Sequence, residues 1–269
     1  MLVTVENWNM KNKIGLYKMI LSAIAVLFIS VFVPVAAQQV IGTKNIVIVH
    51  GAFADGSGWE KVFKILQGDG YNVTMVQNPL TSLEDDVAAT ERILDKQDGP
   101  VVLVGHSWGG AVITQAGMHS KVASLVYVAA FVPEIGETAL DLIKTAPPAA
   151  ENGILPPDEK GFIWYDKAKY HGGFAADISK EKADFMYASQ GPVAVKCFTT
   201  PLSIAAWKTK PSYAIVATED KSINPLIERT MYKRAGSIVT EIKGSHVLFM
   251  SNPKAVADVI EAAAKAAIN

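Results

Sequence analysis

The sequence predicts an α/β protein: a mostly parallel sheet with helices on both faces and a cap inserted above it. Short β-branched runs alternate along the chain with longer stretches of helical period, the pattern of a sheet covered by helices. The runs are nearly continuous in Val, Ile, Leu and Ala, which is typical of parallel strands buried on both faces. One long segment breaks this alternation and predicts the cap.

Six runs are predicted as buried strands, and five stretches carry apolar residues at helical spacing. The last helix is Ala-rich and opens on a Ser-Asn-Pro capping sequence. The expected strands are Lys44–His50, Val73–Gln77, Val101–His106, Ser124–Ala129, Ser212–Ala217 and Ile238–Ile242, and the expected helices are Trp59–Leu66, Ser82–Asp95, Gly109–Met118, Leu226–Arg234 and Ser251–Ala267.

The cap insertion is expected at about residues 134–205, within a single domain of residues 38–269. The stretch Pro133–Thr200 holds two Pro-Pro pairs and several glycines without a good strand, and a loop that long in a compact domain is usually functional or disordered. Its larger apolar side chains are expected to pack, either fastening the cap to the main body or contacting a ligand. They are Trp164, Tyr165, Tyr170, Phe174, Phe185 and Met186.

Residues 1–37 are predicted to be a signal peptide. Three lysines precede an apolar run from Met19 to about Val35, and Val35 and Ala37 supply small residues for cleavage after Ala37. Met10 is an alternative start, and an uncleaved membrane anchor is the competing interpretation. We expect the mature protein to be secreted or periplasmic, with no stable membrane association once the signal peptide is cleaved.

The amino-acid composition limits the kinds of binding partner that we expect. Half of the 269 residues are hydrophobic and the formal net charge is −1, so no basic stripe favours nucleic acid, and a small, weakly charged ligand is expected. Cys197 is the only cysteine, which excludes an internal disulfide and predicts a buried apolar side chain.

The strongest catalytic pattern is Gly105-His106-Ser107-Trp108-Gly109-Gly110, directly after a predicted strand and before a predicted helix. A serine on such a sharp turn projects its hydroxyl from the sheet edge, and small flanking residues permit the turn. The alternative is a glycine-rich turn whose serine only caps the helix. We predict that Ser107 is a nucleophile.

A serine nucleophile needs a base, and His246 is the best placed of the five histidines. It lies in the loop between the last predicted strand and the closing helix. His50 ends a strand and His106 is expected to point away from the nucleophile, while His119 and His171 have no supporting pattern.

A carboxylate must orient that base. Asp220 follows the predicted strand Ser212–Ala217 in a loop that leads into a helix, and it is the preferred acid. The adjacent Glu219 is chemically capable and stays an alternative.

Negative charge formed on a substrate oxygen requires donors already in place. The backbone N–H of Trp108 is one expected donor. The second is expected from Phe53 or Ala52, in the loop that follows His50, where Gly51 lets the backbone approach closely.

These motifs, with His50-Gly51-Ala52, Ala129-Ala130-Phe131-Val132-Pro133 and Gly244-Ser245-His246, resemble the α/β-hydrolase superfamily from about Ile46 to the C-terminus. Within it the chain is most similar to plant methyl-ester esterases, hydroxynitrile lyases and bacterial carboxylesterases, some of which cleave pyrethroid esters. The resemblance implies the α/β-hydrolase fold, a Ser107, Asp220, His246 triad, a helical cap and no cofactor.

Two departures from the lyases imply ester hydrolysis. Those enzymes place a threonine after the first-strand histidine and a lysine after the catalytic histidine, where this chain has Gly51 and Val247. We therefore expect a serine hydrolase, a carboxylesterase acting on small, fairly apolar esters through an acyl-enzyme, with no metal site. The alternatives are a non-catalytic ligand receptor of the same fold, or a lyase or perhydrolase that uses the same serine.

Overall fold

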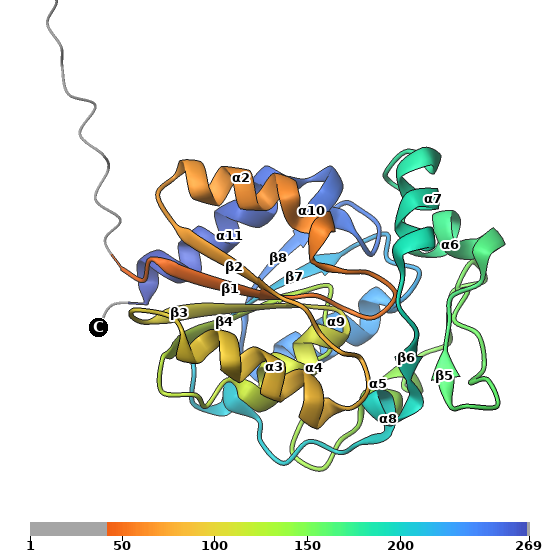
Figure 1. The fold of residues 1–269 in the computed structure, drawn as a ribbon, viewed down its shortest axis with the longest axis horizontal. Coiled ribbons are helices and arrows are strands. Elements are labelled where there is room, and N and C mark those ends of the chain that lie inside the picture. The colour runs from red at the N-terminus through yellow and green to blue at the C-terminus, as the bar shows by residue number, and fades with distance from the viewer. Residues whose placement is uncertain (1–41, 268–269) are drawn as a thin grey trace, which may run out of the picture. The chain divides into compact units, whose positions relative to one another are not determined.

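The computed structural model describes residues 42–267, so the predicted signal peptide lies outside the described residues. A six-stranded sheet of order β2-β1-β3-β4-β7-β8 forms the centre, and every neighbouring pair in it is parallel (Figure 1). Its strands are β1 (Asn45–Val49), β2 (Asn72–Val76), β3 (Val101–His106), β4 (Val122–Val128), β7 (Ser212–Ala217) and β8 (Ile238–Ile242).

Helices cover both faces of this sheet (Figure 1). On one face lie α2 (Glu60–Gly68) and α11 (Pro253–Ala266), and on the other lie α3 (Leu83–Asp95), α4 (Trp108–Ala116) and α9 (Pro225–Ala235). Two short helices, η1 (Gly56–Trp59) and α10 (Leu248–Ser251), pack beside α2. No helix within residues 42–267 combines the length and apolar character needed to cross a membrane.

The predicted α/β class and parallel sheet are confirmed, with each expected strand and helix present and only its ends shifted. The prediction that all six strands are buried is wrong for β2 and β8. Both are edge strands with one neighbour each, and Ile238 of β8 is 61% exposed. Apolar composition alone does not separate an edge strand from a central one.

The segment between β4 and β7 lies beyond the carboxyl ends of the central strands (Figure 1). Only two-residue strands occur in it, which explains why the sequence shows no strand pattern there; β5 and β6 pair antiparallel. We call this segment the insertion. Its elements are α5 (Ala139–Ile143), β5 (Phe162–Ile163), α6 (Lys167–Phe174), α7 (Lys180–Ser189), β6 (Val193–Ala194), α8 (Val195–Thr199) and η2 (Ala206–Lys208).

An aromatic cluster joins the insertion to the main body. The rings of Tyr165, Tyr170 and Phe174 pack mutually, and Phe53, from the loop after β1, contacts the first and third of them. These residues are buried, as is Met186, whereas Trp164 and Phe185 are exposed. The expected packing therefore holds for four of the six side chains named from the sequence.

Two glycines let α4 approach the sheet. A Cβ at Gly109 would lie 2.4 Å from the carbonyl oxygen of Val49, and one at Gly110 would lie 2.3 Å from that of Phe131. Both distances are too short for any side chain. The N-terminus of α4 is consequently held against the ends of β1 and β4.

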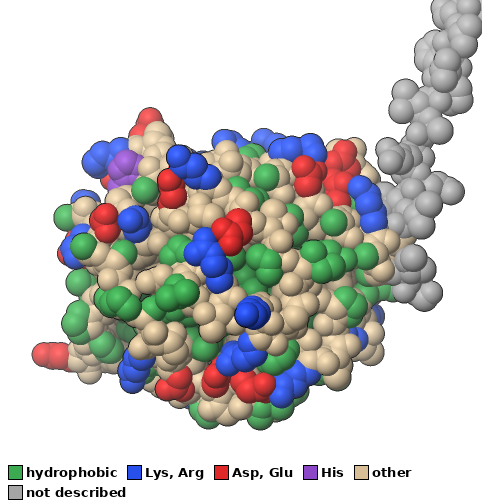
Figure 2. Space-filling model, turned by 180° about the vertical axis from the view of Figure 1, so that it is seen from behind, with side chains coloured by type: hydrophobic (Ala, Val, Ile, Leu, Met, Phe, Trp, Pro, Cys, Tyr) green, Lys and Arg blue, Asp and Glu red, His purple; other side chains and the backbone are tan. Residues whose placement is uncertain are grey.

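The surface carries both signs of charge. On the face shown in Figure 2, Lys and Arg side chains are interspersed with Asp and Glu and with hydrophobic side chains. Several opposite charges are paired, as in Arg229 with Glu241 and Arg234 with Glu137. This face presents no single-sign stripe.

Candidate active site

Ser107 occupies a strained turn between β3 and α4. Its φ of 54° and ψ of −121° lie in a region that residues with a side chain rarely adopt. Its N–H donates to the carbonyl oxygens of Val128 and Ala129, and its own carbonyl accepts from the N–H groups of Gly110 and Phe131. The backbone on both sides of the turn is therefore fixed.

His246 and Asp220 lie beside this serine. Nε2 of His246 is 2.8 Å from Oγ of Ser107, and Nδ1 is 2.5 Å from Oδ2 of Asp220. Because a carboxylate only accepts, Nδ1 carries the proton and Nε2 is left to accept the serine proton. The three side chains form one buried, hydrogen-bonded chain, with 7%, 1% and 3% of Ser107, His246 and Asp220 exposed.

The loop after β7 orients the carboxylate of Asp220. Oδ1 of Asp220 accepts the N–H groups of Ser222 and Ile223 at 2.7 and 2.9 Å, which leaves Oδ2 directed at His246. The alternative acid Glu219 is half exposed and its carboxylate lies 3.5 Å from Nζ of Lys243. The geometry thus places Asp220, and not Glu219, against the imidazole.

Unpaired backbone donors surround the serine. A Cβ at Gly51 would lie 2.6 Å from Cβ of Ser107, so the loop after β1 passes directly beside it. Neither Phe53, whose φ is 59°, nor Ala52 nor Trp108 donates its backbone N–H to another of residues 42–267. Trp108 is the first residue of α4, where the N–H groups have no partner inside the helix. All three expected donors remain free for a substrate oxygen.

His50 and His106 act as neutral, structural groups. The N–H of Asn78 donates to Nε2 of His50, so Nδ1 carries the proton and donates to the carbonyl of Gly51. Burial lowers the pKa of His50, and it holds the pKa of His106 well below the usual value. Nε2 of His106 lies 2.9 Å from the carbonyl oxygen of His246, a contact that the sequence did not reveal and that fixes the backbone of His246.

The insertion contacts each loop of the site. Tyr170 donates its hydroxyl to the carbonyl of Phe53 at 2.8 Å, and Ser222 donates to the carbonyl of Gly173 at 2.9 Å. Asp177, between α6 and α7, accepts from both the N–H and the hydroxyl of Ser245. Sequence reasoning named Tyr170 as a packing residue without its hydrogen bond, and it missed Asp177, a single polar side chain in the irregular segment between α6 and α7.

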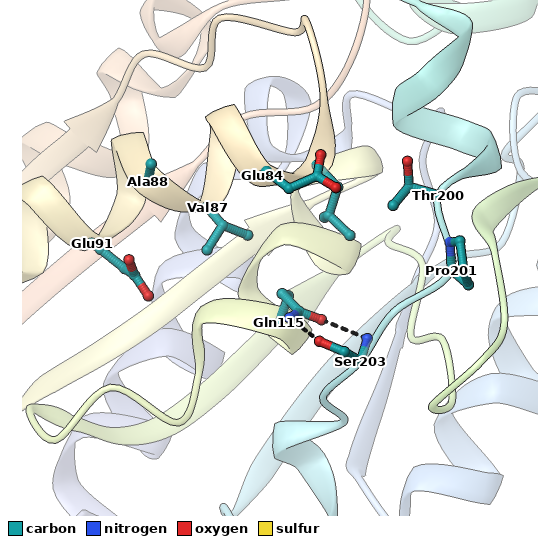
Figure 3. A pocket seen from close by; sticks show the side chains of 9 residues that line it. Glu84, Val87, Ala88, Glu91, Gln115, Thr200, Pro201 and Ser203 are labelled. Carbon is teal, nitrogen blue, oxygen red and sulfur yellow. Dashed lines mark hydrogen bonds between the residues drawn. The ribbon is translucent and has the colours of Figure 1, made fainter.

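Two cavities lie along the insertion and differ in character, and neither is lined by a residue of the Ser107, Asp220, His246 chain. Figure 3 shows one of about 340 Å³ between α3 and residues 200–203, where Gln115 bonds to Ser203. The other, about 300 Å³, is mostly apolar and lies between α5, α8 and the loop after Asp220. Its lining includes Phe198, whose ring is 5.4 Å from that of Trp108.

Residues 42–267 hold neither a cluster of metal-binding side chains nor a reactive thiol. No group of three or more His, Cys, Asp and Glu side chains there could hold a metal ion. Cys197 is buried as expected, and burial raises the pKa of its thiol to about 12, so it stays protonated.

Asp86 holds the side chain of Trp108 by a hydrogen bond. Its carboxylate accepts the indole N–H of Trp108 at 2.7 Å and the backbone N–H of Leu80 at 2.8 Å. Burial nevertheless raises its pKa from 3.8 to about 6. The sequence offered one signal, an acidic residue on the face of α3 that also carries the buried Ala89 and Thr90.

Comparison with known proteins gives a consistent result. A model described as "Alpha/beta hydrolase family" matches residues 46–259. A putative chloroplastic methylesterase of Arabidopsis thaliana is 27% identical over 247 residues, covering 80% of this chain but 62% of the relative. A pyrethroid hydrolase of Sphingobium wenxiniae is 25% identical over 248 residues, covering 80% and 86%.

Solved structures share the fold. A crystal structure of a pyrethroid hydrolase superposes with a TM-score of 0.71 at 23% identity, covering 83% of this chain and 98% of the other. An extracellular alpha/beta-hydrolase from a Paenibacillus species superposes with a TM-score of 0.69 at 20% identity, covering 82% and 99%.

The pKa of Asp86 predicts a pH-dependent stability. The folded protein binds the proton of the Asp86 carboxyl group more tightly than the unfolded chain does, so protonation of Asp86 stabilises the fold. This contribution to the free energy of unfolding is on the order of 3 kcal/mol. It is fully present below about pH 3.8 and is lost as the pH rises through about 6. In urea unfolding, the stability of the wild type minus that of Asp86→Asn should therefore shrink between pH 4 and pH 7.

Asp85→Asn is the matched control. The neighbouring Asp85 accepts the hydroxyl of Thr81, which lowers its pKa, so any trend with pH should have the opposite sign. A wild-type advantage over Asp86→Asn that stays constant or grows toward pH 7 would contradict the assignment.

Proposed function

This chain belongs to the alpha/beta hydrolase family, and on that premise we propose that it is a carboxylic ester hydrolase that forms an acyl-enzyme on Ser107. The observation that carries the proposal is the buried chain of hydrogen bonds from Ser107 through His246 to Asp220. The relatives named as methylesterase and pyrethroid hydrolase support an ester as the substrate.

The geometry supports an acylation step on Ser107. As Oγ of Ser107 attacks the ester carbonyl, Nε2 of His246 takes the hydroxyl proton and the new oxyanion accepts from the N–H of Trp108 and that of Phe53 or Ala52. Asp220 stabilises the imidazolium formed in this step. The C–O bond then breaks, and His246 gives the proton to the departing alcohol.

Deacylation repeats these steps with water. His246 removes a proton from a water molecule as its oxygen attacks the acyl carbonyl, and the same N–H groups receive the second oxyanion. Collapse releases the carboxylic acid and returns the proton to Oγ of Ser107. The assigned residues complete the cycle without a cofactor.

The surroundings of the site support a class of substrate. The apolar cavity of about 300 Å³ adjoins Phe198 and Ile223, which contact Trp108 and Asp220 respectively. We infer that it receives the apolar part of a small ester, and that the insertion serves as a cap that controls entry. Such a lining disfavours peptides and phosphoesters, because the polar amides of the first and the charges of the second would be desolvated without partners.

Covalent labelling tests the function. The purified protein should hydrolyse p-nitrophenyl esters of short acyl chains and should be labelled by a fluorophosphonate probe, since the activated serine attacks phosphorus as it attacks an ester. Ser107→Ala should abolish both, as measured by absorbance and by mass spectrometry of the labelled peptide.

A folded wild-type protein that is never labelled would instead favour a ligand receptor of this fold. Labelling at Ser107 without ester turnover would leave lyase or perhydrolase chemistry, which product analysis with a cyanohydrin, or with peroxide and acetate, would detect.

Replacing the acid should separate Asp220 from its neighbour. Asp220→Asn should lower kcat by on the order of 10⁴ with the fold intact, because the imidazole is then held in the wrong tautomer. Glu219→Gln is the matched control and should change kcat less than about threefold, since this carboxylate faces Lys243. A loss below tenfold in the Asp220 variant would remove this residue from its role.

We also propose export directed by residues 1–37, on the pattern of lysines, apolar run and small residues before Gln38. Protein expressed from the full sequence in a bacterial host should appear in the periplasm or medium. Edman sequencing should read Gln-Gln-Val, and a retained N-terminal segment in a membrane fraction would support the anchor instead.

A further inference from the structure

Glu228 on α9 is a buried carboxyl group that the proposed mechanism does not use. Its side chain is fully buried, and Oε2 accepts the backbone N–H of Ala217 at 3.0 Å. Oε1 is also buried but receives no hydrogen bond from the described residues. An ionised carboxylate in such a place ordinarily has donors on both oxygens.

The neighbour of this group is the acid of the triad. The carbonyl of Ala217 accepts the N–H of Asp220 while its N–H donates to Oε2 of Glu228, so this one residue binds both. Beside burial, the charge of Asp220 raises the pKa of Glu228, so the two carboxyl groups are close neighbours. A hydrogen bond between two carboxyl groups requires a proton on one of them. Asp220 already accepts from three donors, which favours the proton on Glu228.

Within the described chain Glu228 forms no ion pair, and the charge of Arg229 opposes the rise of its pKa only in part. Arg229 follows it on α9 but is held at the surface by Glu241 of β8. Tyr232, one turn further on, both donates to and accepts from the backbone of Ala130. Burial, with the charge of Asp220 added, raises the pKa of Glu228 well above its ordinary value.

We propose that Glu228 is a positioning residue that stays neutral and holds Asp220 by donating a hydrogen bond from Oε1. The proposal rests on the proposed function, because Asp220 matters to the reaction only as the acid of the triad. It goes further by giving Asp220 a fixed partner in addition to His246 and the N–H groups of its own loop. The imidazole of His246 then faces a single carboxylate charge, that of Asp220, and several hydrogen-bond donors already share this charge.

Two substitutions separate this role from simple packing. Glu228→Gln keeps an acceptor for Ala217 and a donor for Asp220, whereas Glu228→Met fills similar space with neither. The control is Glu261→Gln on α11, another carboxyl with a buried oxygen that lacks a partner in the described residues. Circular dichroism and thermal unfolding would establish that each variant folds.

The readouts are kcat, KM and the pH profile of kcat/KM for a p-nitrophenyl ester. Glu228→Met should lose at least about tenfold in kcat, with KM changed less than about threefold. The acid limb of its pH profile should move up by about 0.5 pH units or more, because Asp220 without its donor attracts the imidazole proton more strongly. Glu228→Gln should recover most of kcat and keep the acid limb within about 0.3 pH units. Glu261→Gln should match the wild type throughout.

Two results would overturn the proposal. A downward shift of the acid limb in Glu228→Gln would mean that the wild-type group is ionised, since the substitution would then remove a negative charge near the base. A Glu228→Met variant with wild-type kcat and pH profile would mean that Asp220 needs no such donor.

Proton NMR keeps the test independent of activity. The downfield resonance of the His246 Nδ1 proton, assigned by its loss in His246→Gln, should persist in Glu228→Gln and shift or broaden in Glu228→Met. If the wild type hydrolyses no ester, the proposed function fails while this resonance still decides the hydrogen bond. An unchanged resonance in Glu228→Met would refute the bond.

Discussion

Ser107 adopts a backbone conformation that is unfavourable by on the order of 1–3 kcal/mol, and the surrounding fold is arranged to hold it there. Its peptide groups bond to the end of β4 and to Phe131, while Gly51, Gly109 and Gly110 admit backbone contacts that leave no room for a Cβ. The parallel order of β1, β3 and β4 brings these segments to one sheet edge. The strained turn therefore depends on the whole central sheet, and it directs the hydroxyl toward the loop that carries His246.

The remaining site groups come from loops, which a sheet alone does not position. The insertion supplies the missing constraint, because Tyr170, Gly173 and Asp177 bond to the loops that hold Phe53, Ser222 and Ser245. The aromatic cluster around Phe174 also contacts the ring of His246. A movement of the insertion would consequently disturb these three loops together. Under the proposed function, the access of a substrate and the geometry around Ser107 are coupled through these hydrogen bonds.

The sequence predicted the parallel sheet and the residues at its carboxyl edge because both depend on local patterns. Continuous apolar runs specify strands, and a glycine-flanked serine between strand and helix specifies its turn. The insertion itself was expected, but its internal structure was beyond such reasoning, since β5 and β6 span two residues each and α6 contains two glycines, one of which packs against the backbone of Glu151. Glu228 did leave a signal: it lies three and four residues before the buried Met231 and Tyr232, so a carboxyl group interrupts the buried face of α9.

Two buried carboxyl groups flank the site, and their charge states have different consequences. Asp86 accepts the indole N–H of Trp108, whose backbone N–H is an expected oxyanion donor, and an ionised carboxylate there would oppose developing negative charge; its bonds to two N–H groups disperse that charge. Glu228 lies on the other side, beside Asp220. A second ionised carboxylate there would stabilise the imidazolium before attack as well as during it, so the base would already hold a proton and could not take one from Ser107. A neutral Glu228 orients Asp220 without adding that charge, which is the condition under which His246 works as a base.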